Sequence, residues 1–432
     1  MARLLKTSDP DFAQQLATLL ADRAAAEEGV REAVSDIIAQ VRERGDAALI
    51  ELTERFDRFD ARAQGLAIPK EELQAAGARI GQELYKALKL AAERIRAYHE
   101  RQLPQDELFT DETGATLGHR WTPVDAAGLY VPGGLAAYPS SVLMNAIPAR
   151  VAGVKRLVMA VPTPDGQVND LVLAAAYLSG VDEVWRIGGA QAVAALSFGT
   201  ESIAPVDVIV GPGNAYVAEA KRQVFGTVGI DMIAGPSEVL IIADETANPA
   251  WLAADLLAQA EHDALAQSVL LTPSAQLAEQ VAREVERQLE TLPRKDIAGA
   301  SWRDHGAIIM VGDLAEAAAL SNRFAPEHLE LALSDPDALL PEIRHAGAIF
   351  LGHFTPEAVG DYVAGPNHVL PTSRSARFSS GLSVLAFMKR TTVLSCTPEA
   401  LNEIGPAAVR LARAEGLQAH ARSVRARLNR EI

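Results

Sequence analysis

The spacing of apolar residues divides the chain into two parts. Up to about residue 120, apolar positions recur at helical intervals, as at Val34, Ile37, Ile38 and Val41, so this part is predicted to be mainly helical. From residue 126, short apolar runs alternate with longer segments that begin or end at glycine. The runs predict strands at 129–131, 157–161, 183–187, 208–210 and 239–243, separated by helices at 140–151, 168–179, 190–198 and 214–225.

The same alternation continues after residue 244. Asn248 and Pro249 supply the cap and the first turn of a helix predicted over 249–262. More strands are predicted near 268–272, 307–311, 329–333 and 348–351. Strands that alternate with helices through short loops are typical of parallel sheets covered by helices on both faces. The predicted fold is therefore α/β, and ligands are expected beyond the carboxyl ends of the strands, where glycine loops follow at 132–134, 188–189 and 211–213.

The pattern changes again at residue 382. A helix is predicted from Thr397 to Glu415, Gly416 interrupts it, and a basic helix follows from about residue 418. Residues 393–396 are apolar and strand-like, but no strands remain for the two helices to join. Two helices beyond a finished domain usually pack on another subunit, so we expect the tail to reach a partner chain.

Composition and charge narrow the functional classes. A chain of 432 residues with 49% hydrophobic and 22% charged residues is typical of a globular protein of two or more domains. A net charge of −16 disfavours nucleic acid and anionic membranes as partners. The sequence has no recognisable secretory signal and no apolar run long enough to span a bilayer. The single cysteine, Cys396, follows apolar residues and is predicted to be a small hydrophobic side chain in a reducing, cytoplasmic protein.

An adjacent carboxylate and imidazole, Glu327 and His328, are the strongest candidates for proton transfer. They follow a predicted helix end, with Pro326 before them. Neighbours on regular structure point apart, so the pair could act on one small molecule only from an irregular turn. There, a neutral histidine can take a proton from an alcohol, and a carboxylate can take one from water. A helix cap beside a structural histidine explains the pair equally well.

Other polar residues could form a metal site. Gln259 and His262 are three apart on one predicted helix, which suits two ligands of one metal but also a histidine placed at a helix end. Asp361, before a Gly-Pro-Asn turn, is either a hard oxygen ligand or a turn cap. Glu415 and His420 flank a glycine, and by themselves they indicate only a surface hinge.

Eight segments that follow one another along nearly the whole chain resemble the histidinol dehydrogenase family. They are GLYVPGG (128–134), GGAQA (188–192), VGPGNAYV (210–217), AGPSE (234–238), QAEHD (259–263), APEHLE (325–330), GDYVAGPNHVLPT (360–372) and EGLQAH (415–420). The resemblance implies oxidation of L-histidinol through the aldehyde to L-histidine, with two NAD⁺ and one water, as the last two steps of histidine biosynthesis. It also implies one zinc ion per subunit and an intertwined homodimer with shared active sites.

The resemblance implies two incomplete Rossmann-like parallel-sheet domains with helical extensions at both ends. The N-terminal helical segment would cover 1–25. The domain that carries the metal and catalytic residues would combine 26–129 with 239–381. The NAD-binding domain would cover 130–238, and the C-terminal helical extension, 382–432, would reach the partner subunit.

The matching motifs imply a role for each site residue. The implied zinc ligands are Gln259, His262, Asp361 and, from the partner chain, His420. Glu327 and His328 would be the acid–base residues. Substrate would contact the zinc ligands together with Ser237, His328 and Glu415. NAD would be held at Tyr130, Gln191 and Asn214.

These roles fit the chemistry of the substrate. Histidinol has an amine and an imidazole that can bind zinc, while His328 would take the hydroxyl proton and Glu327 would activate the water that adds to the aldehyde. Three alternatives are a related enzyme for another polar alcohol, a zinc hydrolase without a cofactor and a non-catalytic binding protein. The carboxylate of Glu415 disfavours an anionic substrate, and the glycine loops favour a dehydrogenase over a hydrolase.

Overall fold

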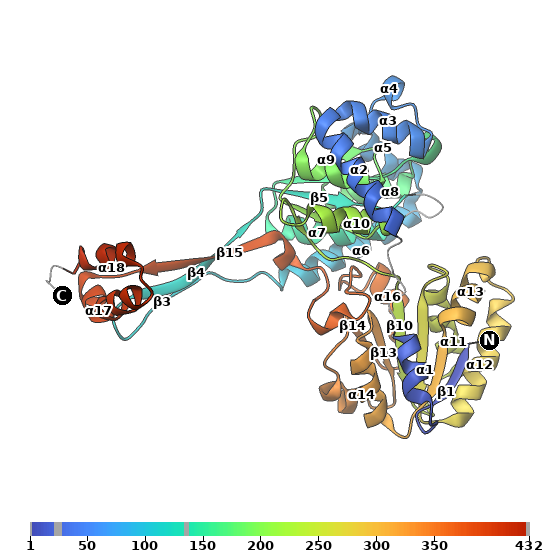
Figure 1. Cartoon of the computed structure of the whole chain (residues 1–432). Helices are drawn as coiled ribbons and strands as arrows, with labels where there is room; N and C mark the ends of the chain where they lie inside the picture. Colours follow the sequence, from blue (N-terminus) through green and yellow to red (C-terminus); the bar gives the residue numbers. More distant parts are fainter. Residues whose placement is uncertain (1, 21–27, 134–137, 429–432) are drawn as a thin grey trace.

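The first of two α/β units is built on a sheet whose neighbouring strands are all parallel. The computed structural model describes residues 2–20, 28–133 and 138–428 (Figure 1). In spatial order the strands are β1 (Arg3–Lys6), β12 (Ala307–Met310), β11 (Gln267–Thr272), β10 (Glu238–Ala243), β13 (His328–Ala332) and β14 (Ala348–Leu351). The helices of this unit are α1 (Phe12–Leu19), α11 (Pro249–Ala260), α12 (Ala275–Leu289), α13 (Lys295–His305), α14 (Leu314–Phe324), α15 (Pro336–Leu339) and α16 (Glu357–Tyr362).

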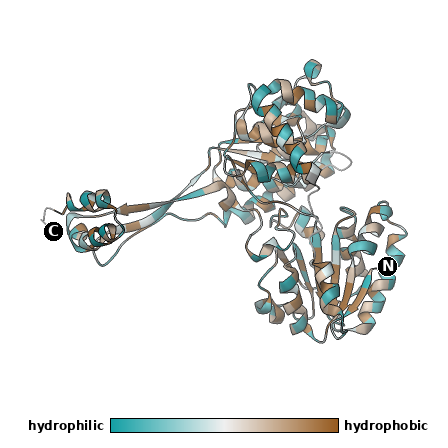
Figure 2. Ribbon diagram, viewed as in Figure 1, coloured by the Kyte–Doolittle hydropathy of each residue, from teal (hydrophilic) through white to brown (hydrophobic). Residues whose placement is uncertain are grey.

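Alternate residues of the central strand β10 enter two different hydrophobic clusters. Leu240 and Ile242 pack in one cluster, and Val239 and Ile241 pack in the other. Both faces of the sheet are therefore covered, which explains why its strands are continuous apolar runs rather than alternating ones. Figure 2 shows these strands as hydrophobic and the outer helix surfaces as largely hydrophilic.

The second unit contains a sheet of six strands in which only β2 runs antiparallel to its neighbour. In spatial order the strands are β2 (Ala67–Ile68), β7 (Glu183–Trp185), β6 (Arg156–Ala160), β5 (Ala126–Tyr130), β8 (Val208–Val210) and β9 (Gly229–Ile230). The helices of this unit are α2 (Glu28–Arg44), α3 (Asp46–Asp57), α4 (Ala61–Gln64), α5 (Lys70–Arg79), α6 (Gln82–Glu100), α7 (Pro139–Ala152), α8 (Asp170–Ser179), α9 (Gly189–Phe198) and α10 (Ala215–Val224).

A long arm projects away from both units (Figure 1). Its antiparallel sheet consists of β3 (Glu107–Thr110), β4 (Thr116–Pro123) and β15 (Met388–Ser395), and it ends in α17 (Pro398–Ala414) and α18 (Gln418–Arg425). The two helices share only a small buried cluster, Val409, Ala421 and Leu428. Such a cluster is too small to support an independent domain.

The predicted α/β architecture with parallel sheets is confirmed, but three predictions about its boundaries are wrong. Residues 3–6 form a strand, β1, rather than part of a helical segment, because β1 adds to the edge of the first sheet beside β12. Helices α2 to α6 pack on the second sheet rather than with 239–381, as the clusters that contain Val34 and Leu49 on one face and Leu73 and Ile95 on the other show. The tail contains a strand, β15, which pairs with β4 over eight residues.

Some predicted segments lie outside the described residues, namely 21–25, Gly134 of the first glycine loop and 429–432. Within the described ranges, no helix combines the length and apolar character needed to cross a membrane.

Candidate active site

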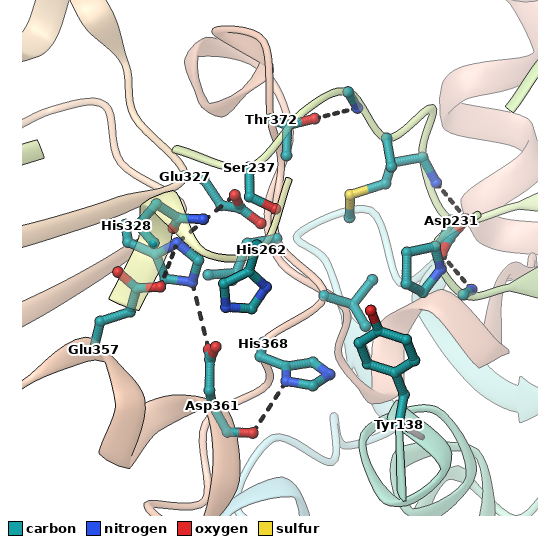
Figure 3. Close-up of a pocket in the computed structure, with 18 of the residues that line it drawn as sticks. Tyr138, Asp231, Ser237, His262, Glu327, His328, Glu357, Asp361, His368 and Thr372 are labelled. Carbon is teal, nitrogen blue, oxygen red and sulfur yellow. Dashed lines mark hydrogen bonds and ion pairs between the residues drawn. The ribbon is translucent and has the colours of Figure 1, made fainter. Parts of the chain in front are cut away.

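A cavity of about 140 Å³ is lined by residues from both units. The first unit contributes Ser237, Gln259, His262, Glu327, His328, Glu357 and Asp361, and the second contributes residues of the loops after β8 and β9. Figure 3 shows the side chains of Glu357, Asp361 and His262 gathered around the ring of His328. The cavity therefore combines all the predicted acid–base and metal-binding side chains of the first unit.

A sharp turn between α14 and β13 brings Glu327 and His328 into this cavity. Ala325, after the last residue of α14, adopts a left-handed conformation with φ of 46°, and Pro326 follows it. His328 is then the first residue of β13, beside Val239 in β10. A carboxylate oxygen of Glu327 accepts a hydrogen bond from the amide of Glu238 at 3.0 Å. The predicted turn is thus present, and it lets neighbouring side chains face the same cavity.

His328 is surrounded by carboxylates. Its Nδ1 lies 3.7 Å from Glu327 and 3.6 Å from Glu357, and its Nε2 lies 3.6 Å from Asp361. Burial alone would lower the pKa of the imidazole, but the three carboxylates outweigh it and raise the pKa well above its usual value. The carbonyl of Glu238 lies 3.1 Å from Nδ1 and can only accept, so Nδ1 donates and Nε2 is the nitrogen that can exchange a proton.

Burial also changes the acidity of two carboxyl groups next to this histidine. It raises the pKa of Glu327 to about 7 and that of Glu357 to about 8, because the charged form loses water. A carboxylate with a pKa near 7 is a stronger base than an ordinary glutamate, so Glu327 is suited to take a proton at neutral pH.

The amide of Gln259 is the clearest sign that a ligand belongs in the cavity. Gln259 lies in the last turn of α11 and is 1% exposed, yet neither its oxygen nor its nitrogen has a hydrogen-bond partner among the described residues. A buried amide without partners is costly. His262 follows the helix and Asp361 lies in α16, and both also line the cavity. Amide oxygen, imidazole and carboxylate together form a donor set that suits zinc.

A second combination of side chains could also hold a cation. His328, Glu357 and Asp361 each offer a ligand atom, and these atoms lie within 4.8 Å of one another. Asp361 belongs to both combinations. His328 Nε2 and Glu357 Oε2 also have no hydrogen-bond partner among the described residues, but of these side chains only Gln259 has both of its polar atoms without one, which favours the combination that includes it.

Comparisons with known proteins agree with this chemistry. The sequence profile described as Histidinol dehydrogenase matches residues 20–428. The chain belongs to the histidinol dehydrogenase family. It is 65% identical to the Histidinol dehydrogenase of Rhodospirillum rubrum, over 99% of this chain and 98% of that one, and 64% identical to that of Ruegeria pomeroyi, over 100% and 99%. A crystal structure of histidinol dehydrogenase from Elizabethkingia anophelis superposes with a TM-score of 0.94 at 37% identity, covering 99% of this chain and 98% of that one.

In this member of the histidinol dehydrogenase family, the residues predicted to hold NAD lie at the carboxyl edge of the second sheet. Tyr130 ends β5, Gln191 lies in the first turn of α9, and Asn214 caps α10 by accepting from two backbone amides at 3.1 Å. The hydroxyl of Tyr130 accepts from the amide of Gly189 at 3.1 Å, and burial raises its pKa to about 12. All three residues therefore lie at or just beyond the carboxyl ends of strands of one sheet, where such folds bind ligands.

Two predicted residues of this family member are not brought to the cavity of their own chain. Glu415 directly follows α17, His420 lies in α18, and both side chains are exposed. The two helices stand at the far end of the arm (Figure 1). Their roles were predicted for a partner chain and stay predictions.

Sequence reasoning missed Glu357 and the ion pair between Lys221 and Asp231. Glu357 is four residues before Asp361, a helical spacing that could have revealed it. The Lys221 ammonium also donates to the carbonyl of Gly211 at 3.0 Å, so the buried pair holds the glycine loop at the cavity. No local pattern marks that contact, because it joins a residue of α10 to the separate loops after β8 and β9.

The predicted role of Cys396 is wrong. The residue is exposed rather than a buried hydrophobic side chain. It directly follows β15, which pairs with β4 in the arm and is exposed from Lys389 to Ser395 in the single chain.

Proposed function

We propose that this protein oxidises L-histidinol through L-histidinal to L-histidine with two NAD⁺ and one water at a zinc-containing site. Family membership makes the chain an NAD-dependent oxidoreductase of histidine biosynthesis. The observation that carries the proposal is the family match over residues 20–428. The matched residues include those that line the cavity, whose side chains are suited to proton transfer and metal binding. We further propose the cytoplasm as its compartment, two incomplete Rossmann-like domains as its scaffold, and a homodimer as its assembly.

The side chains in the cavity support a zinc site formed by Gln259, His262 and Asp361, completed by His420 of the partner subunit. The unpartnered Gln259 amide is the structural reason, because an oxygen ligand without a cation would otherwise be buried at a cost. When bound, zinc would hold the amine and imidazole of the substrate and NAD⁺ would accept hydride. The partner subunit's Glu415 and Ser237 of the same chain would contact the substrate.

His328 and Glu327 would carry the two proton transfers. In the first oxidation, the neutral form of His328 takes the proton of the substrate hydroxyl at Nε2, the nitrogen that does not donate to Glu238. Because the carboxylates raise the pKa of the ring, His328 must first release the proton that it carries at Nε2. After the aldehyde forms, Glu327 takes a proton from the water whose oxygen bonds to the aldehyde carbon. The hydrate anion that results loses a second hydride, for which a second NAD⁺ would be the acceptor, and one proton to solvent, which gives the carboxylate of histidine.

The arm supports the proposal of a homodimer with shared sites. Its apolar side chains Leu108, Phe109, Leu394 and Leu411 are between 52% and 66% exposed in the single chain. Exposed apolar groups on a thin projection of this kind are typical of a surface that a second subunit covers.

Turnover with histidinol is the direct test. We expect NADH to form in a ratio of about two per histidinol consumed, since two oxidations occur at one carbon. The absorbance of NADH measures turnover with histidinol and with histidinal, and uncharged diols of similar size serve as controls. No turnover of histidinol, together with turnover of another alcohol, would contradict the proposed substrate.

Replacing Gln259 with leucine should weaken zinc binding by at least about tenfold. Loss of a group that only hydrogen-bonds to a metal ligand typically weakens metal binding about 10–100-fold, and here a proposed ligand itself is lost. Leucine has a similar volume and removes the unpartnered buried amide, so the protein should fold at least as well. Competition with a chromophoric chelator gives the zinc dissociation constant. An unchanged constant would remove Gln259 from the ligand set.

A further inference from the structure

Helix α16 carries two of the carboxylates of the site but is short. It runs only from Glu357 to Tyr362. Glu357 and Asp361 are four residues apart, so they share one face, and both approach the ring of His328 (Figure 3). A helix of this length is not stable by itself. The position of Asp361 must therefore be fixed by groups outside the helix.

The N-terminal end of α16 is held by the first unit. The amide of Glu357 donates to the side chain of Glu330, in β13, at 2.8 Å. Glu330 is two residues beyond His328 on the same strand, so this contact ties the start of the helix to the sheet that carries the acid–base residues.

The C-terminal end of α16 is held by the second unit. Arg94, in α6, donates from Nε to the carbonyl of Val363 at 2.7 Å and from Nη2 to the carbonyl of Ala364 at 3.0 Å. These are the first two carbonyls after the helix, where partial negative charge is concentrated and a cation is favourable. The planar guanidinium suits two neighbouring acceptors, which a lysine ammonium could not bind in the same way.

The chain after α16 also fits closely against the second unit. Gly365 has φ of 117°, and a Cβ at this position would lie 3.0 Å from the carbonyl oxygen of Arg94. Asn367 then donates from Nδ2 to the carbonyl of Met144, in α7, at 2.6 Å. The segment from Val363 to Asn367 is thus fixed to α6 and α7, although the helix before it belongs to the first unit.

We propose that Arg94 is a positioning residue. It sets the place of Asp361, and so of the zinc site, relative to the second unit, which carries the residues proposed to hold NAD. The role of Asp361 as a zinc ligand rests on the proposed function, whereas the link between the end of α16 and α6 rests on the two hydrogen bonds of Arg94. The carbonyl of Asp361 also lies 3.0 Å from Nδ1 of His368, which adds a contact at the ligand itself. Because the guanidinium joins the end of α16 to α6, a displacement of one unit relative to the other is transmitted to Asp361.

The test compares Arg94→Met and Arg94→Lys with the unchanged protein. Methionine keeps the apolar stem but removes the donors, and lysine keeps the charge without the fork. For Arg94→Met we expect faster amide hydrogen exchange in 357–366 and a zinc dissociation constant raised about five- to tenfold, since two hydrogen bonds to one charged group are lost. Arg94→Lys should show the same two changes, but each should be smaller than in Arg94→Met. With histidinol, kcat should fall more than KM rises.

Lys89→Met is a matched control, because Lys89 is an exposed cation on the same helix with an ion pair to Glu93 at 3.7 Å. It should leave exchange in 357–366 and zinc binding unchanged. The proposal would be overturned if Arg94→Met and Lys89→Met had the same amide exchange rates in 357–366 and the same zinc dissociation constant. So would a uniform rise in exchange across both units, since Arg94 would then act through general stability. Failure of the unchanged protein to oxidise histidinol would instead contradict the proposed function, and the exchange data would still decide the role of Arg94.

Discussion

Replacing His328 with asparagine should lower kcat for histidinol by about 10²–10⁴-fold, the usual contribution of a positioned acid–base group. The imidazole lies between three carboxylates, and its Nδ1 is occupied by the Glu238 carbonyl, so Nε2 is left to take the proton of the alcohol. Asparagine can still donate a hydrogen bond to that carbonyl, but it cannot accept a proton. The loss should therefore appear in kcat, with little change in the thermal unfolding midpoint.

Comparison with Glu327→Gln separates the two proton transfers. Glutamine keeps the size of the side chain but cannot take a proton from water, so this variant should lose more activity with histidinal than His328→Asn does. His328→Asn should lose more in the first oxidation, which single-turnover measurements with histidinol isolate. The opposite pattern with the two substrates would contradict the division of roles between these neighbours.

Local sequence patterns predicted most of the two sheets. The runs that became β5, β6, β8, β10 and β11 are apolar because helices cover both faces of each sheet, and the glycines and prolines that end them are visible in the sequence. The sheet against which each helix packs could not be predicted from such patterns. An amphipathic helix such as α2 reveals that one face is buried, but not which sheet buries it.

The errors came from contacts between distant parts of the chain. β15 pairs with β4, more than 250 residues earlier, and its exposed side chains lack the alternation that marks a half-buried strand. In the site, motifs identified Glu327, His328 and Gln259. They did not identify Glu357, although its helical spacing from Asp361 was available, and they could not identify Arg94, whose contacts arise only when the end of α16 is folded against α6.

Mixing two inactive variants should restore activity if each site uses residues of both chains. His262 lines the cavity, whereas His420 lies on α18 at the end of the arm. We expect His262→Asn and His420→Asn to be nearly inactive alone, since each lacks a proposed zinc ligand. In a heterodimer, one site combines both defects and the other is intact. Random exchange of subunits should therefore restore about a quarter of the normal activity.

A second mixture provides the control for this experiment. His262→Asn and His328→Asn alter the same unit, so every site in their heterodimer keeps one defect and no activity should return. Native mass spectrometry of tagged subunits measures the heterodimer fraction, and NADH formation measures recovery. Heterodimers of the first pair that form but stay inactive would mean that His420 does not complete the partner's site. Recovery in proportion to the heterodimer fraction, absent from the control pair, requires the arm of one chain to reach the cavity of the other.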